Sequence, residues 1–250
     1  MLKTIKSKVL GLISKRYMPN KKKLVVLSGS GISAESGLST FRDSGGLWEG
    51  YNINEVATPE GWNRNPKQVL DFYNLRREQA GKALPNKAHL KLVGLESLFD
   101  VDIVTQNVDD LHERAGSSKI LHLHGQLTKA RSVDNENLIV EIGTNPIYLG
   151  DVGSDGKQLR PHVVWFGEMV PMLEKAALIV EKADILVVIG TSLVVYPAAS
   201  LIDFAPDYCE KYIIDPSTPE LYSFDGWTHI KERATSGIEQ LITELEKDHG

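Results

Sequence analysis

Short apolar runs rich in β-branched residues recur along the chain, and most of them close on a glycine or a small polar residue. They are LVVLSGSG from Leu24, VDIVTQN from Val101, ILHLHG from Ile120, HVVWFG from His162, DILVVIGTS from Asp184 and KYIIDP from Lys211. Runs that are apolar on both faces and alternate with helix-like segments are typical of parallel strands covered by helices on both sides. The pattern predicts an α/β fold with a doubly wound, Rossmann-like parallel sheet.

The polar residues that end these runs should meet at one edge of the sheet. In doubly wound sheets, the ligand crevice lies beyond the carboxyl ends of the strands. The residues expected there are Ser28, Gly29, Gln106, Asn107, His124, Gly125, Phe166, Gly167, Gly190, Thr191, Ser192 and Asp215.

Two segments interrupt the alternation of strands and helices and are predicted to form a smaller lobe over the crevice. Residues 43–82 contain the turn signals SGG, TPEG and NRNP and then the helical stretch QVLDFYNLRREQA. Residues 128–160 are polar, with short possible strands at NLIVEI and PIYL. The larger lobe of this single domain, 1–250, then comprises residues 20–42, 83–127 and 161–250.

The first 19 residues carry lysines, and their apolar positions recur with helical spacing. We expect an amphipathic helix packed on the domain, with a transit peptide or a membrane-surface helix as the alternative. No apolar run approaches the length of about 20 residues that spans a bilayer, and no signal-peptide pattern opens the chain. We therefore expect a cytoplasmic protein without a membrane partner.

The composition narrows the choice of partners. The formal net charge of −5 disfavours a surface that neutralises nucleic-acid phosphates, so we expect no nucleic-acid partner. For the oligomeric state, a monomer is favoured. The single cysteine, Cys209, can form neither an internal disulfide nor a thiolate zinc site, and we interpret it as a small core residue.

The segment GSGISA follows the first run and matches a dinucleotide-binding fingerprint. Gly29, Gly31 and Ala34 have the G-x-G-x-x-G/A spacing, in which glycines allow a tight turn and let backbone N–H groups approach a pyrophosphate. A plain tight turn is the alternative. A dehydrogenase would next show an acid about 20 residues further on, whereas this chain reads ESGLSTFRDSGGLW. Asp215, after a late strand, either holds the ribose and favours NAD over NADP, or begins an Asp-Pro turn.

Five ordered motifs, GSGISAESGLSTFRDSGGLW, TQNVDDLHERAG, LHGQL, RPHVVWFGE and GTSLVVYPAA, resemble those of the sirtuins, NAD-dependent protein lysine deacylases. The resemblance runs from about Leu24 to Ala199 and implies a set of NAD contacts. Asp215 stands where the family usually has Asn, and Ala234 is placed near the adenine. The implied contacts are Gly29, Ser30, Gly31, Ser33, Ala34, Phe41, Arg42, Gln106, Asn107, Asp109, Gly190, Thr191, Ser192, Asp215 and Ala234.

The same resemblance assigns catalysis to His124, with Asn107 and Asp109. The acyl-lysine carbonyl oxygen attacks the anomeric carbon and expels nicotinamide; His124 then deprotonates a ribose hydroxyl that attacks the resulting imidate. The products are free lysine, nicotinamide and an O-acyl-ADP-ribose. An imidazole suits this task because its ordinary pKa of about 6.5 leaves it largely neutral at physiological pH. The other histidines of the region, His112, His122 and His162, are predicted to be structural.

Two further sets of residues are implied to bind the acylated-lysine protein substrate. Val164, Trp165, Phe166, Gly167 and Glu168 would offer an edge to which the substrate peptide adds as a strand. Tyr73 and Arg76, three positions apart on a helix, resemble the pair of class III sirtuins, which prefer succinyl, malonyl or glutaryl lysine. A guanidinium binds a carboxylate through paired hydrogen bonds. Acetyl removal stays open, and an arginine that is merely solvated is the competing interpretation.

The chain departs from the family between Leu127 and Arg160, where most sirtuins place two pairs of cysteines around a structural Zn²⁺. This stretch contains no cysteine, so we predict a metal-free lobe held by Leu138, Ile139, Ile142, Ile147 and Tyr148. Two other functions stay open: a mono-ADP-ribosyltransferase or NAD hydrolase, and a non-catalytic NAD-sensing module.

Overall fold

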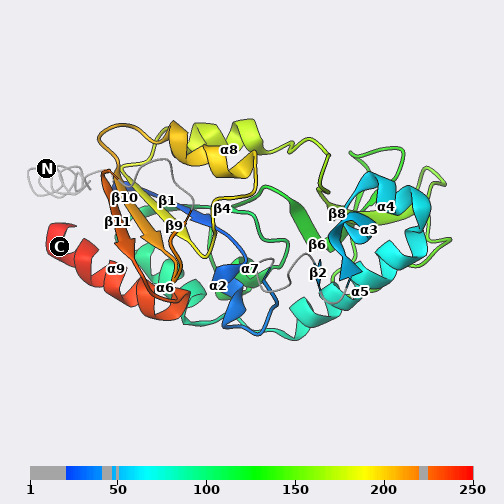
Figure 1. The fold of residues 1–250 in the computed structure, drawn as a ribbon, viewed down its shortest axis with the longest axis horizontal. Coiled ribbons are helices and arrows are strands. Elements are labelled where there is room, and N and C mark those ends of the chain that lie inside the picture. Colours follow the sequence, from blue (N-terminus) through cyan, green and yellow to red (C-terminus); the bar gives the residue numbers. More distant parts are fainter. Residues whose placement is uncertain (1–20, 41–46, 49–50, 220–224, 250) are drawn as a thin grey trace, which may run out of the picture.

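The computed structural model describes residues 21–40, 47–48, 51–219 and 225–249 of the 250-residue chain. The predicted helix at 1–19 and the predicted NAD contacts Phe41 and Arg42 lie outside these ranges. The described residues form a large lobe around a parallel sheet and a small lobe of helices with a second, antiparallel sheet (Figure 1). None of the described helices is long and apolar enough to cross a membrane.

The large lobe is built on six parallel strands in the order β11-β10-β9-β1-β4-β5. The predicted α/β fold with a doubly wound parallel sheet is therefore confirmed. The strands are β1 (Lys23–Ser28), β4 (Asp100–Thr105), β5 (Ile120–His122), β9 (Ile185–Ile189), β10 (Glu210–Ile214) and β11 (Trp227–Ile230).

Helices cover both faces of this sheet because successive side chains of each strand point to opposite faces. Leu24 and Val26 of β1 pack with helices α6 (Lys87–Leu95) and α9 (Ala234–His249). Val25 and Leu27 pack on the other face with α8 (Leu173–Val180) and the 3₁₀ helix η2 (Ala198–Phe204). Two short helices, α2 (Gly31–Ala34) and α7 (Leu111–Ala115), follow β1 and β4 near the carboxyl edge.

The small lobe contains helices α3 (Ile53–Val56), α4 (Pro59–Arg64) and α5 (Pro66–Lys82). The predicted helix QVLDFYNLRREQA is confirmed as part of α5, which begins where the Asn65 side chain accepts a hydrogen bond from the Gln68 N–H and Pro66 occupies the first turn. A three-stranded sheet packs against α5, in the order β7 (Ile139–Glu141), β6 (Gly125–Ser132) and β8 (Leu159–Val163). A two-stranded ladder joins β2 (Leu47–Trp48) to β3 (Tyr51–Asn52).

The run HVVWFG was expected as a parallel strand, and this expectation was wrong. Its first two residues end β8 (Leu159–Val163), which pairs antiparallel with β6 (Gly125–Ser132) in the small lobe. Val163 is buried against residues of α5. An apolar run indicates that a strand is buried on both faces. Burial alone does not show whether the strand belongs to a parallel or an antiparallel sheet.

The two short strands expected in the polar segment had different outcomes. NLIVEI contains β7 (Ile139–Glu141), which pairs with β6. PIYL forms no strand, because the Asn74 side chain takes the place of a strand partner. Asn74 Oδ1 accepts the Ile147 N–H at 2.9 Å, and Asn74 Nδ2 donates to the Ile147 carbonyl at 2.8 Å.

The apolar cluster expected in this segment is only partly correct. Ile147 and Ile142 do pack in one cluster, but their partners are Leu70, Ala130, Leu159 and Trp62. Ile139 and Tyr148 are 46% and 61% exposed. The segment therefore takes its core from α5 and the β6–β8 ladder.

Candidate active site

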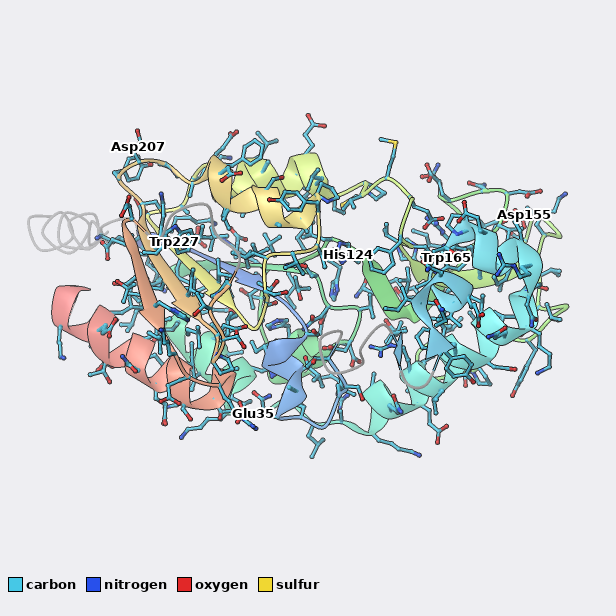
Figure 2. The ribbon with its side chains drawn as sticks, viewed as in Figure 1. Glu35, His124, Asp155, Trp165, Asp207 and Trp227 are labelled. Atoms are coloured by element: carbon cyan, nitrogen blue, oxygen red, sulfur yellow. The ribbon has the colours of Figure 1, made fainter. Side chains whose placement is uncertain are left out.

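A cavity of about 620 Å³ lies beyond the carboxyl ends of β1, β4, β9 and β10 and reaches into the small lobe. His124 lies between the two lobes, and Trp165 lies in the small lobe (Figure 2). Ser28 and Gly125, which were expected at this edge, are not among its lining residues, and Phe41 and Arg42 lie outside the described ranges. Every other site residue predicted from the sequence lines this cavity. These residues are Gly29, Ser30, Gly31, Ser33, Ala34, Tyr73, Arg76, Gln106, Asn107, Asp109, His124, Val164, Trp165, Phe166, Gly167, Glu168, Gly190, Thr191, Ser192, Asp215 and Ala234.

The glycines of the loop after β1 bring two backbone segments into contact. A Cβ at Gly31 would lie 2.7 Å from the Gly190 Cα, so any side chain there would collide with the loop after β9. Gly29 and Gly31 donate their N–H groups to the carbonyls of Ile189 and Gly190. These two N–H groups are therefore not available to a phosphate, contrary to the usual explanation of the fingerprint. Close packing is what requires glycine here.

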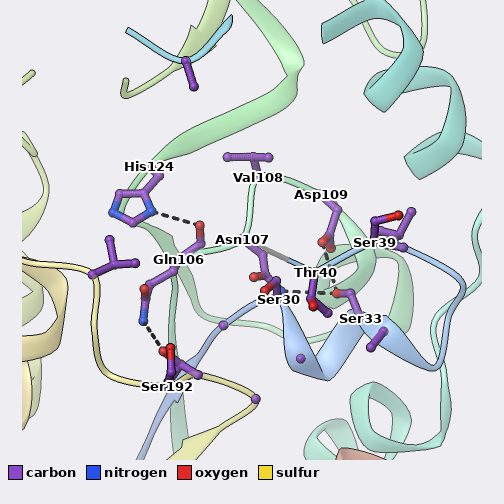
Figure 3. A pocket seen from close by; sticks show the side chains of 18 of the residues that line it. Ser30, Ser33, Ser39, Thr40, Gln106, Asn107, Val108, Asp109, His124 and Ser192 are labelled. Atoms are coloured by element: carbon purple, nitrogen blue, oxygen red, sulfur yellow. Dashed lines mark hydrogen bonds between the residues drawn. The ribbon is translucent and has the colours of Figure 1, made fainter. Parts of the chain in front are cut away.

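A hydrogen-bonded set joins the first and second βα loops at the centre of the cavity (Figure 3). Ser33 Oγ donates to Asp109 Oδ2 at 3.1 Å and accepts from Asn107 Nδ2 at 3.2 Å. Asp109 Oδ1 accepts the Leu111 N–H. Burial raises the pKa of Asp109, while the hydrogen bonds from Ser33 Oγ and the Leu111 N–H oppose that shift. The set fixes Asn107 and Asp109 beside the loop after β1.

A second polar set lies below the loop in the core. Ser28 Oγ donates to Thr105 Oγ1 at 2.8 Å, and Thr105 Oγ1 accepts the Asn107 N–H at 3.0 Å. His112 Nε2 lies 3.0 Å from Ser28 Oγ, and burial lowers the pKa of His112 to about 3. His112 is thus a neutral core side chain that supports the strand ends, in agreement with its predicted structural role.

The hydrogen bonds of His124 define its tautomer. His124 Nδ1 lies 3.1 Å from the Gln106 carbonyl oxygen, which can only accept, so Nδ1 carries the proton and Nε2 keeps its lone pair (Figure 3). Gln106 is fixed in turn by a 3.2 Å bond from its Nε2 to Thr191 Oγ1. Burial lowers the pKa of His124, and the bond to Gln106 opposes that shift. The side chain is a neutral base at physiological pH.

His122 differs from His124 in its surroundings. We expected both on one strand, but β5 ends at His122 and β6 begins at Gly125, so His124 lies in the bend between them. His122 Nδ1 lies 2.9 Å from the Asn107 carbonyl, and its Nε2 lies 2.7 Å from Glu113 Oε1. Both nitrogens are occupied, as expected of a structural histidine. No partner was found for His162 Nδ1 in the described part of the chain, so its structural role stays a prediction.

The small-lobe end of the cavity holds the Tyr-x-x-Arg pair. Tyr73 is buried, and burial raises its pKa, so its hydroxyl stays protonated. The Arg76 guanidinium carbon lies 5.9 Å from the centre of the Phe72 ring. Both side chains line the cavity from α5, as their spacing predicted.

The segment from Val164 to Glu168 has already used most of its backbone donors. The N–H groups of Val164 and Phe166 donate to the carbonyls of His124 and Ala57, and the Trp165 N–H donates to the Glu168 carboxylate. That carboxylate also binds Arg160 and Arg131. The Glu168 side chain therefore has a structural role in this state, whereas sequence reasoning assigned it to substrate binding.

The opposite end of the cavity lies between β10 and α9. Asp215 is buried, and its Oδ1 accepts the Ser217 N–H at 2.8 Å, so it does begin the turn. It also lines the cavity, as Ala234 does. Glu35 accepts hydrogen bonds from the Thr235 N–H and hydroxyl, which joins the end of α2 to the start of α9.

Several lining residues were missed by sequence reasoning, namely Glu35, Leu38, Ser39, Thr40, Ala57, Val108, Val163, Val170, Val195, Tyr196, Pro197, Ile214, Pro216, Ser217 and Arg233. Val108 was signalled by its place between Asn107 and Asp109, and Val195 to Pro197 by their place in the motif GTSLVVYPAA. Ala57 offers no such signal, because only the packing of the small lobe brings it to the cavity.

The residues between Leu127 and Arg160 do not fit the family's structural zinc site. Such a site needs four thiolates, and the only cysteine of the chain, Cys209, lies elsewhere. Among the residues that the structure describes, no group of three or more His, Cys, Asp and Glu side chains could hold a metal ion. Cys209 is buried, and burial raises its pKa to about 11, as expected of an inert core thiol.

Comparisons with known proteins agree with this geometry. The Sir2 family model matches residues 29–197. The NAD-dependent protein deacylase of Helicobacter pylori strain ATCC 700392 / 26695 is 52% identical over 224 residues, which cover 90% of this chain and 97% of that protein. The structure of a Sir2 homologue in complex with NAD is 37% identical, with a TM-score of 0.82 and coverage of 98% of this chain and 95% of that one.

A more distant structure, Sir2Tm bound to a propionylated peptide, is 25% identical, with a TM-score of 0.73 over 96% of this chain and 98% of that one. The family match covers well over half of the chain and includes the glycine loop, the TQN segment, His124 and the Val164–Glu168 segment. The chain therefore belongs to the Sir2 family.

Proposed function

We propose that the chain is an NAD-dependent protein lysine deacylase. The observation that carries the proposal is the arrangement of His124, whose Nε2 lone pair is free, in one cavity with the glycine loop, Asn107 and Asp109. The relative from Helicobacter pylori is named for this activity, and the Sir2 homologues include complexes with NAD and with an acylated peptide.

The proposed reaction uses these residues in separate roles. The loops that carry Gly31 and Gly190 would hold the phosphates, and Asn107 and Asp109 would hold the nicotinamide end. The acyl-lysine carbonyl oxygen attacks the anomeric carbon, and nicotinamide leaves. His124 Nε2 would then accept a proton from a ribose hydroxyl, which attacks the acyl carbon. A water molecule adds to the resulting intermediate, so that free lysine leaves and an O-acyl-ADP-ribose remains. General base catalysis by such a group contributes about 10²- to 10⁴-fold.

The substrates proposed are proteins with acylated lysines, and the preferred acyl groups are those with a terminal carboxylate. Support comes from Tyr73 and Arg76, which supply a protonated hydroxyl and a guanidinium at the small-lobe end of the cavity. A carboxylate that leaves water needs such a charged, hydrogen-bonded partner. Succinyl and malonyl lysine fit this chemistry, and acetyl lysine would bind without the ionic contact.

Arg76→Met tests the acyl preference, because it removes the guanidinium and keeps a long side chain. We expect kcat/KM for a succinyl peptide to fall at least tenfold, since hydrogen bonds to charged groups contribute about 1.5–3 kcal/mol. The value for the same peptide with acetyl lysine should change less than about twofold. The measurement is mass spectrometry of peptide products with and without NAD, on acetyl, malonyl and succinyl peptides.

Lys67→Met, which breaks an exposed ion pair with Asp71 on the same helix, is the matched control. Equal losses on acetyl and succinyl peptides in the Arg76 variant would defeat the acyl assignment. Nicotinamide release without any deacylated peptide would instead favour an ADP-ribosyltransferase or NAD hydrolase.

The small lobe is proposed to be stable without a metal ion. The support is its chemistry: it has no cysteine between Leu127 and Arg160, and Ile147, Leu159 and Ala130 form an apolar cluster with Leu70 of α5.

A further inference from the structure

His122 and Glu113 form a partly buried pair behind Asn107, and the proposed reaction gives neither of them a role. His122 Nε2 lies 2.7 Å from Glu113 Oε1, and His122 Nδ1 lies 2.9 Å from the Asn107 carbonyl oxygen. The side chains of His122 and Glu113 are 9% and 36% exposed. Neither of the two lines the cavity, whereas Asn107 does. The contact with Asn107 therefore links the pair to a ligand in the cavity.

The two contacts of His122 define where its protons lie. The Asn107 carbonyl can only accept, so His122 Nδ1 carries a proton. Burial raises the pKa of Glu113, but the hydrogen bond and charge of His122 oppose it, and the pKa lies below its ordinary value. An ionised Glu113 also only accepts, so both ring nitrogens donate and His122 is an imidazolium. Removing such charges from water is costly, so the pair calls for a reason beyond stability.

Two histidines hold two consecutive carbonyls of the loop after β4. His124 Nδ1 binds the Gln106 carbonyl at 3.1 Å, and His122 Nδ1 binds the next carbonyl, that of Asn107. The Asn107 N–H donates to Thr105 Oγ1 at 3.0 Å, so the peptide units on both sides of Asn107 are held. The backbone thus fixes the direction from which the Asn107 side chain enters the cavity (Figure 3).

We propose that His122, held by Glu113, is a positioning residue: its Nδ1–H fixes the Asn107 carbonyl and thereby the side chain that holds the nicotinamide end of NAD. The inference rests on the proposed function, which places nicotinamide beside Asn107. It goes further because it gives a charged pair outside the cavity a role in cofactor affinity. Binding of ADP-ribose, which lacks nicotinamide, should not depend on the pair.

Two substitutions at His122 separate its two hydrogen bonds. The amide nitrogen of asparagine takes the place of Nδ1, and that of glutamine takes the place of Nε2, since each lies as many bonds from Cβ as the ring nitrogen that it replaces. His122→Gln therefore keeps the donor to Glu113 and loses the donor to Asn107, whereas His122→Asn does the reverse. Both variants lose the ring, so each controls for the loss of packing in the other.

The measurement is calorimetry on the full chain with an excess of acyl peptide. The ligands are ADP-ribose and carba-NAD, an analogue in which a methylene replaces the ring oxygen, so that nicotinamide is not released. In His122→Gln, the Kd of carba-NAD should rise about fivefold, the effect of about one hydrogen bond, and that of ADP-ribose should stay within about twofold. In His122→Asn, both values should stay within about twofold. Equal losses for the two ligands, equal losses in the two variants, or an unchanged Kd of carba-NAD in His122→Gln would overturn the positioning role.

A double-mutant cycle with Asn107→Ala tests whether the effect passes through that side chain. This substitution keeps the backbone carbonyl and removes the side-chain amide, so His122→Gln should then weaken carba-NAD binding no further. Additive effects would contradict the proposal. His122→Met, which offers a donor at neither position, is the second variant if His122→Gln does not fold, and the same loss is expected of it.

The Asn107 carbonyl also reports on the contact in the ligand-free protein. Its carbon resonance should shift in His122→Gln, where the donor is lost, and stay in place in His122→Asn; an unchanged resonance in His122→Gln would refute the positioning role. A wild-type protein that binds carba-NAD but removes no acyl group would refute the proposed deacylase function and leave the positioning role to the binding data. A wild-type protein that does not bind carba-NAD would refute both.

Discussion

His124 and His122 are two positions apart, and their hydrogen bonds give them opposite roles. The Gln106 carbonyl fixes the proton of His124 on Nδ1 and leaves Nε2 as a base. Glu113 and the Asn107 carbonyl occupy both nitrogens of His122. The difference arises because the chain bends after His122, where Gly125 takes a φ of 80° and a Cβ would lie 2.1 Å from the His162 carbonyl oxygen.

The lowered pKa of His124 predicts how activity depends on pH. Only the neutral imidazole can accept a proton, and burial moves the pKa below the ordinary 6.5. The neutral form therefore persists at lower pH, so the acid limb of the kcat/KM profile should have its midpoint below pH 6.5. The measurement is kcat/KM for an acyl peptide between pH 5 and 8. A midpoint above pH 6.5 would contradict the burial argument.

At the residue scale, the sequence predicts which side chains meet but not all of their partners. The polar endings of the strands indicated Asn107, His124 and Asp215, since parallel strands end at one edge. Glu168 was assigned to substrate because nothing in the motif RPHVVWFGE shows that its carboxylate binds Arg160 and Arg131. Arg131 lies 37 positions away, and only the pairing of β6 with β8 brings it close.

At the element scale, strands were easier to predict than their direction. The central strands β1, β4 and β9 are apolar on both faces, which made them visible in the pattern. The edge strand β11 was missed because only Ile230 of its four residues is buried. β8 was predicted to belong to the parallel sheet of the large lobe, whereas it pairs antiparallel with β6 in the small lobe. A strand covered on both faces has the same composition in a parallel and in an antiparallel sheet.

The contact between the loops after β1 and β9 is an element-scale feature that Gly31→Ala tests. The added Cβ would lie 2.7 and 2.8 Å from the Cα and carbonyl oxygen of Gly190, which are backbone atoms and cannot rotate away. We expect the unfolding free energy to fall by about 1–3 kcal/mol, as for other overpacked sites. KM for NAD should rise about tenfold, because the loop that would hold its phosphates is displaced.

Gly94→Ala is the matched control, because it lies in α6 and its Cβ would meet nothing within 4 Å. Helix propensity predicts that this change stabilises the protein by about 0.5–1 kcal/mol. If Gly31→Ala instead kept full stability and an unchanged KM for NAD, the close approach of the two loops would not matter.

At the scale of the whole molecule, the cavity lies where the two lobes meet, and both contribute to it. The large lobe supplies the loops with Gly31, Asn107 and Gly190, and the small lobe supplies Tyr73 and Trp165. The order of the motifs along the chain made this division predictable, whereas the apolar core of the small lobe was predicted with only two of its members, Ile142 and Ile147. The others lie on α5, β6 and β8, outside the stretch in which sequence reasoning sought them.

The proposed metal independence of the small lobe predicts the response of the molecule to a chelator. We expect purified protein to contain no stoichiometric zinc by elemental analysis and to keep its unfolding midpoint within about 1 °C in excess EDTA. Structural zinc contributes folding free energy directly, so its removal lowers stability. One tightly bound zinc per chain would refute the proposal.

The central claim is that the cavity joins NAD cleavage to deacylation through His124, and the product balance tests it most directly. Wild-type protein, NAD and a succinyl peptide are followed by mass spectrometry, with His124→Ala in parallel. We predict one O-acyl-ADP-ribose and one nicotinamide for each lysine released by the wild type, and a loss of at least 100-fold in the variant, the lower range for a general base. Equal turnover by the two proteins, or nicotinamide release without an acylated ADP-ribose, would contradict the account.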